Sequence, residues 1–137
     1  MKTIFYISLL IILSGCLRKE VDGIKIGHNL YDTQTIGFNN TLCSLIEGTL
    51  KGDSQSLEKL INIWDGGASG SYDKGDVIVE ILARIGEKEF IKMAVRLDKQ
   101  NRLKLKSYLL VGIEYGQLSN PKNLEKEFPE LNKLIDN

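Results

Sequence analysis

The chain has 137 residues, in which 18 lysines and arginines balance 18 aspartates and glutamates. A nucleic-acid-binding protein would gather an excess of positive charge on one face, so this balance argues against a nucleic-acid partner. Hydrophobic residues make up 42% of the chain and charged residues 26%, which is ordinary for a folded domain. The length fits one domain and is too short for two of the usual size.

The first 16 residues form a distinct segment. Lys2 is the only charged side chain, residues 4–13 are apolar except for Tyr6 and Ser8, and the run ends in Leu13-Ser14-Gly15-Cys16. This order of charge, apolar run, small residues and cysteine resembles the signal peptide and lipobox of a bacterial lipoprotein. An uncleaved membrane anchor is the weaker interpretation, because a spanning helix needs roughly 20 apolar residues and this run has about half of that.

The resemblance implies that residues 1–15 are a signal peptide and that Cys16 becomes the first mature residue, attached to the membrane by lipid on its thiol. Two or more acyl chains hold a protein stably, whereas one does so only marginally. The residue after the cysteine affects sorting in such lipoproteins, and Leu17 is not the aspartate that retains enteric lipoproteins in the inner membrane. The expected location is the cell envelope, at the outer membrane and facing the periplasm.

Residues 16–38 show no lasting helical or strand period, because charged residues and three glycines interrupt it. The alternation Ile24-Lys25-Ile26 fits a short strand, but one strand without a partner is not stable alone. We therefore expect the lipidated cysteine to be followed by a tether that holds the folded domain clear of the headgroups.

Residues 39–137 are expected to form a single helical domain. Asn39 or Asn40 is a fair N-cap for its first helix, and apolar residues then recur at helical spacing. Gly52-Asp53 ends that helix and caps the next one, so residues 40–65 are expected to form an antiparallel helical hairpin.

Residues 73–97 repeat this plan, with Asp73 as the N-cap and Gly86-Glu87 at the corner. The two glycine-acid corners lie 34 residues apart, a period that weakly resembles HEAT-like helical repeats. Stacking of the hairpins in chain order would place residues 65–73 near residues 98–101.

A further helix is expected from Lys99 or Gln100 to Tyr115, where Gly116 ends it. Asn120-Pro121 is typical of a cap followed by proline at the first helical position, and Pro129 begins a last helix. The predicted fold is therefore all-α, with about six or seven helices stacked as antiparallel hairpins in a HEAT-like array or an irregular helical bundle.

Residues that carry chemistry are sparse. The only histidine, His28, lies in the expected tether, so neither a Ser–His or Cys–His pair nor a metal site is expected. Cys43 lies among the apolar residues of the first helix, where a free cysteine packs as a small hydrophobe. We expect no enzyme, metal or cofactor. The weakest alternative is a carboxylate-dependent glycan-acting enzyme, for which the spacing selects no pair among Glu80, Glu87, Glu89 and Glu114.

The stretch 65–76 is rich in glycine and is flanked by aromatic residues. It fits neither the nucleotide-binding glycine motifs nor an EF-hand, so one interpretation is a flexible connection. The other is a recognition loop, since tryptophan and tyrosine anchor interfaces. Trp64 completes the apolar stripe of its helix and is expected to pack, which leaves Tyr72 as the better contact. With a second patch at Gly116, the candidate partner-binding residues are Trp64, Asp65, Tyr72, Asp73, Glu114 and Tyr115.

Taken together, these features favour a membrane-anchored lipoprotein that works by binding another protein of the envelope. The most concrete version is an immunity-type inhibitor of an envelope toxin or hydrolase. The alternative is a structural or assembly lipoprotein of the cell envelope.

Overall fold

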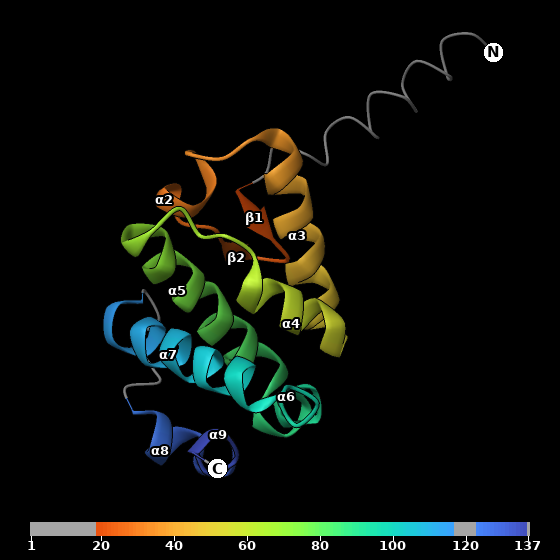
Figure 1. Cartoon of the computed structure of the whole chain (residues 1–137), viewed down its shortest axis with the longest axis vertical. Coiled ribbons are helices and arrows are strands. Elements are labelled where there is room, and N and C mark those ends of the chain that lie inside the picture. The colour runs from red at the N-terminus through yellow and green to blue at the C-terminus, as the bar shows by residue number, and fades with distance from the viewer. Residues whose placement is uncertain (1–18, 117–122, 137) are drawn as a thin grey trace, which may run out of the picture.

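The computed structural model describes residues 19–116 and 123–136, so the signal segment, Cys16, Gln117 and the Asn120-Pro121 cap lie outside the described residues. Eight helices and one two-stranded sheet within them form a helical bundle, which confirms the all-α prediction (Figure 1). In these two ranges no helix is long and apolar enough to cross a membrane. The elements are β1 (Glu20–Val21), β2 (Ile24–Lys25), α2 (His28–Tyr31), α3 (Ile36–Leu50), α4 (Ser54–Asn62), α5 (Ala68–Ile85), α6 (Glu87–Ala94), α7 (Lys99–Tyr115), α8 (Leu124–Glu127) and α9 (Pro129–Asp136).

The predicted tether is wrong from Lys19 onward, because this stretch folds onto the helices. β1 and β2 pair antiparallel, with Val21 opposite Ile24, around a turn at Asp22-Gly23 in which both residues have positive φ. Such Asp-Gly turns match the twist of the two strands they join. Val21 and Ile24 are 5% and 0% exposed and belong to the core. Two-residue strands are too short to show a period in sequence, and packing against α3 and α5 supplies the stability that a lone hairpin lacks.

Two short helices are capped by carboxylates from other helices. α2 begins after Gly27, which has no side chain to cap it, and Asp73 of α5 accepts a hydrogen bond from the Leu30 backbone N–H at 3.0 Å. Glu87 of α6 likewise accepts from the Leu131 N–H of α9 at 2.8 Å. The prediction that Asp73 caps its own helix is therefore wrong, since its carboxylate holds α2 against α5.

The first long helix starts earlier than predicted. α3 begins at Ile36 because the Thr35 hydroxyl accepts from the Phe38 N–H at 3.2 Å, as an N-cap does. Asn39 is not a cap but a buried helical residue whose amide donates to the Tyr31 carbonyl at 3.0 Å.

Both predicted corners are confirmed. Gly52 and Gly86 have φ values of +84° and +83°, the left-handed conformation that glycine adopts without a steric cost. Asp53 caps α4 by accepting from the N–H groups of Gln55 and Ser56. α7 also runs as predicted, from Lys99 to Tyr115 with Gly116 at its end.

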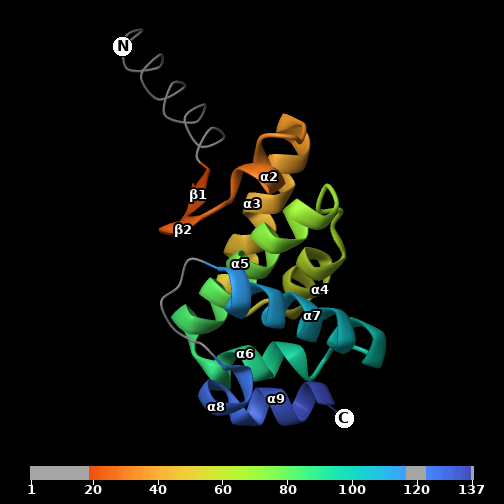
Figure 2. The same cartoon turned by 90° about the vertical axis from the view of Figure 1, so that its left-hand side faces the viewer.

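The helices do not pair in chain order after the first hairpin. α3 packs against α4, but α5 packs principally against α7 rather than α6, as Figure 2 shows. The crossing is close because Gly75 of α5 faces Gly112 of α7, and a Cβ added at Gly75 would lie 2.7 Å from the Tyr108 carbonyl oxygen. This antiparallel pairing brings the start of α5 to the end of α7, so the predicted position of residues 65–73 near 98–101 is wrong.

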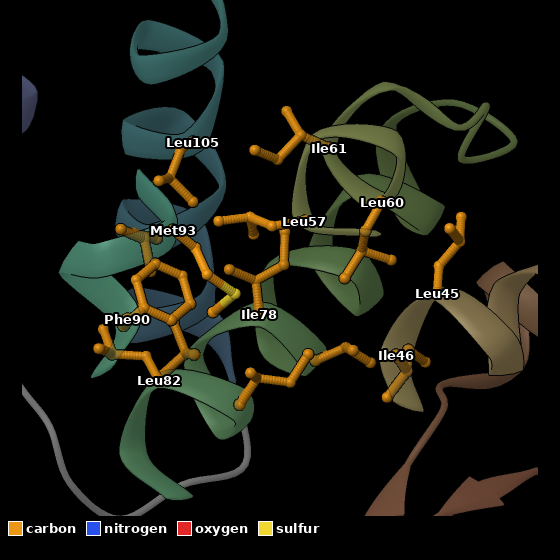
Figure 3. Packing of buried hydrophobic residues seen from close by; sticks show 14 of the residues in the cluster. Leu45, Ile46, Leu57, Leu60, Ile61, Ile78, Leu82, Phe90, Met93 and Leu105 are labelled. Atoms are coloured by element: carbon orange, nitrogen blue, oxygen red, sulfur yellow. The ribbon is translucent and has the colours of Figure 1, made fainter. Parts of the chain in front are cut away.

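The core lies between these helices. Figure 3 shows side chains of α3, α4, α5, α6 and α7 converging, among them Ile46, Leu57, Ile78 and Phe90. Each of these four is 0% exposed. Cys43 is half-buried and packs against this cluster, as predicted.

Candidate partner-binding surface

The glycine-rich connection is shorter than predicted because α5 already begins at Ala68. Gly66 and Gly67 turn the chain with φ values of +80° and +104°. The Asp65 carboxylate then accepts from the Gly67 N–H at 3.1 Å and from the Ser71 hydroxyl at 2.7 Å, which fixes the first turn. These contacts outweigh the low helix propensity of serine and glycine in residues 68–71. Tyr72 is consequently held on a helix and not on a flexible loop.

A buried lysine determines where α4 ends. Lys74 is 1% exposed, and its ammonium donates to the carbonyls of Ile61 at 3.1 Å and Ile63 at 2.6 Å. Lysine near a helix C-terminus satisfies carbonyl groups that have no partner within the helix. α4 therefore stops at Asn62, and Trp64 leaves the apolar stripe with 66% of its surface exposed. The prediction that Trp64 is packed is wrong for this reason.

Asp65, Lys74 and Tyr108 form one network below the surface. The Tyr108 hydroxyl donates to the Asp65 carboxylate at 2.8 Å, and the Lys74 ammonium lies 3.8 Å from the same carboxylate oxygen. That ammonium also lies 4.4 Å from the centre of the Tyr108 ring, a cation–π distance. The network joins the start of α5 to the middle of α7.

The pKa values follow from burial and from these contacts. Burial lowers the pKa of Lys74 to about 8, although the charge of Asp65 opposes this shift. Burial alone would raise the pKa of Asp65, but hydrogen bonds from Ser71, Tyr108 and Gly67 and the charge of Lys74 bring it below its ordinary value. Burial has the largest effect on the pKa of Tyr108 and raises it, and the hydrogen bond to Asp65 raises it further. At neutral pH the network thus contains an ammonium, a carboxylate and a neutral phenol.

Two tyrosines lie together on the outside of this network. The rings of Tyr72 and Tyr115 are 5.0 Å apart in an edge-to-face arrangement, and the residues are 46% and 61% exposed. A hydrogen bond with the Glu114 carboxylate raises the pKa of the Tyr115 phenol. Trp64 directly precedes Asp65 in the chain. We call Tyr72, Glu114 and Tyr115 the aromatic surface, and Trp64 is a further exposed aromatic residue of this region.

The structure thus sorts the six predicted residues into two groups. Trp64, Tyr72, Glu114 and Tyr115 are exposed, and the antiparallel helices bring the two predicted patches into contact through the tyrosine pair. Asp65 and Asp73 are half-buried, and their carboxylates bind groups within the fold.

Lys74 and Tyr108, which lie on the two helices that carry Tyr72 and Tyr115, were not predicted from the sequence as part of this region. A signal for Lys74 was present, because it precedes Ile78 and Ile81 by four and seven residues and so lies on the buried stripe of α5. A cation on such a stripe indicates a buried partner.

An open cleft of about 620 Å³ lies between α7 and the α8–α9 pair, and Glu114 borders it. Within this cleft the Lys106 ammonium pairs with the Asp136 carboxylate, which also accepts a hydrogen bond from the Asn132 amide. Among residues 19–116 and 123–136, no group of three or more histidine, cysteine, aspartate or glutamate side chains is placed to hold a metal ion. The aromatic surface offers contact area and hydrogen-bonding groups.

Comparison of the chain with protein-family models, with curated proteins and with solved structures finds no match.

Proposed function

We propose that this protein is a membrane-anchored, periplasm-facing lipoprotein that binds another protein of the cell envelope through its aromatic surface. The most specific form of the proposal is an immunity-type inhibitor of an envelope toxin or hydrolase. The observation that carries the binding part is the exposed Tyr72–Tyr115 pair, held on two packed helices. Rigid, exposed aromatic side chains bind partners with little loss of conformational freedom, and tyrosine and tryptophan dominate binding hot spots.

The anchoring part rests on the N-terminal sequence that ends in Leu13-Ser14-Gly15-Cys16. We expect Cys16→Ala to abolish lipid attachment and processing, because the thiol that receives the lipid is gone. Metabolic labelling with radioactive palmitate, followed by fractionation of the membranes, measures this. Labelling of Cys16→Ala at the wild-type level would contradict the lipobox assignment.

The binding part is tested by recovery of partners from the solubilised envelope, with the lipidated chain as bait and mass spectrometry as the readout. One stoichiometric toxin or hydrolase supports the inhibitor. Several envelope-assembly proteins would instead favour the alternative, a structural lipoprotein. No protein above background would count against a partner in the same cell.

The double variant Tyr72→Ala and Tyr115→Ala is expected to weaken partner binding by about 2 kcal/mol, or roughly 30-fold, because truncating anchor residues at the centre of an interface has this effect. Calorimetric titration with the recovered partner measures the change. Val95→Ala is the matched control, since Val95 is also an exposed apolar residue (55%) but follows α6 and lies outside the aromatic surface. Equal affinity of the double variant and the wild type would show that the aromatic surface does not bind the partner.

A further inference from the structure

The fold begins close to the lipidated cysteine. The Lys19 carbonyl accepts from the Ile26 N–H at 2.9 Å, and the Lys19 ammonium pairs with Asp32 at 2.5 Å. The next two residues form β1, whose Val21 is in the core. The chain is therefore tied to the domain from Lys19 onward.

The remaining length of chain limits how far the domain stands from the bilayer. Only three residue steps separate Cys16 from Lys19, and a fully extended chain covers about 11 Å over that distance. α3 alone, with its 15 residues, is about 22 Å long. A connection half as long as one helix holds the domain against the headgroups instead of clear of them. This step rests on the proposed lipid anchor at Cys16.

The end of the molecule that carries Lys19 also exposes an apolar side chain. Figure 1 shows β1, α2 and the start of α3 at one end of the long axis and α8 and α9 at the other. Ile36, the first residue of α3, is 71% exposed, more than any other large hydrophobic residue in the described ranges. A single exposed apolar residue is ordinary on a soluble surface. Here it lies on the end that the short connection holds at the membrane.

We propose that the lipidated protein rests on the bilayer by this end, with Ile36 entering the boundary between headgroups and acyl chains. Lys19 and Lys25 lie on the same hairpin, but Glu20, Asp22 and Asp32 accompany them, so charge does not determine the orientation. The short connection between Cys16 and Lys19 imposes this orientation, and the exposed Ile36 side chain is compatible with it. α8 and α9 then point away from the membrane.

The test uses the full, lipidated chain in vesicles of phosphatidylethanolamine and phosphatidylglycerol with brominated acyl chains, which quench nearby tryptophan. Trp64→Phe removes the native tryptophan, and a single reporter is then introduced as Ile36→Trp or, at the start of α9, as Glu130→Trp. Both sites are exposed. We expect the tryptophan at position 36 to lose most of its fluorescence in brominated lipid and its emission maximum to shift to the blue. The tryptophan at position 130 is expected to fluoresce equally in brominated and unbrominated lipid.

Equal quenching at the two positions, or none at position 36, would overturn the proposed orientation. Mass spectrometry of the same samples reports whether Cys16 carries lipid, so a failure of the anchor is distinguished from a failure of the orientation. Because the vesicles contain no other protein, quenching at position 36 reports contact with lipid. If a lipidated sample shows no quenching at position 36, this end of the domain does not contact the bilayer.

Discussion

Gly112→Ala is expected to lower the free energy of unfolding by about 3 kcal/mol, because overpacking against unyielding neighbours has costs of this order. The new Cβ would overlap the carbonyl of Gly75 in the facing helix. Both groups belong to helix backbones, so no flexible side chain can move aside and α5 and α7 must separate. The gain of about 1 kcal/mol from replacing glycine within a helix does not offset this.

Chemical denaturation followed by circular dichroism measures the change. Gly37→Ala is the matched control, because Gly37 lies in α3 with nothing within 4 Å of an added Cβ. The control is expected to be as stable as the wild type or more stable by up to about 1 kcal/mol. A Gly112→Ala variant with wild-type stability would show that the α5–α7 crossing is looser than the structure has it.

Asp65→Ala is expected to lower the free energy of unfolding at pH 6 by about 3 kcal/mol, because it leaves a buried ammonium without its counter-charge. Lys74 is 1% exposed, and the Tyr108 hydroxyl loses its acceptor as well. The exposed pair of Glu89 and Lys92 gives the control, since Glu89→Ala is expected to change the stability by no more than about 0.5 kcal/mol.

The same variant is expected to show a pH dependence of known sign. Lys74 loses its proton at about pH 8 in the folded chain, below its ordinary value of 10.5 in the unfolded chain. Between these values the unfolded state binds more protons at Lys74, so the contribution of Lys74 to the stability of the wild type rises with pH. Loss of Asp65 lowers the pKa of Lys74 further, so in the variant this contribution begins to rise at a lower pH.

The destabilisation by Asp65→Ala is therefore expected to be smaller at pH 9 than at pH 6. Denaturation curves of both proteins at the two pH values measure this. A destabilisation that stays constant or grows towards pH 9 would mean that the Lys74 charge is not the cause.

Features with a local cause were predictable from the sequence. The Gly52-Asp53 and Gly86-Glu87 corners and the bounds of α7 follow from glycine conformations, acidic caps and apolar spacing, and the structure confirms them. The features that were predicted wrongly depend on contacts between segments that are distant in the sequence. Lys74 ends α4 two residues before Trp64, and the strands β1 and β2 are stable only on α3 and α5.

The candidate surface shows the same division. Residue type identified Tyr72 and Tyr115 separately, but their contact depends on the pairing of α5 with α7, which are not consecutive helices. In the sequence, only the glycines Gly75 and Gly112 within the two helices pointed to this pairing. The spacing of a glycine within a helix does not identify which other helix it contacts.

Photo-crosslinking in living cells tests the central claim most directly. A photoreactive phenylalanine analogue is placed at position 72 in the lipidated chain, and at position 130 for comparison. Tyr72 lies on the aromatic surface, whereas Glu130 is exposed at the start of α9. We expect a discrete adduct with an envelope protein from position 72 and none from position 130. No adduct from position 72, with a specific one from position 130, would contradict it.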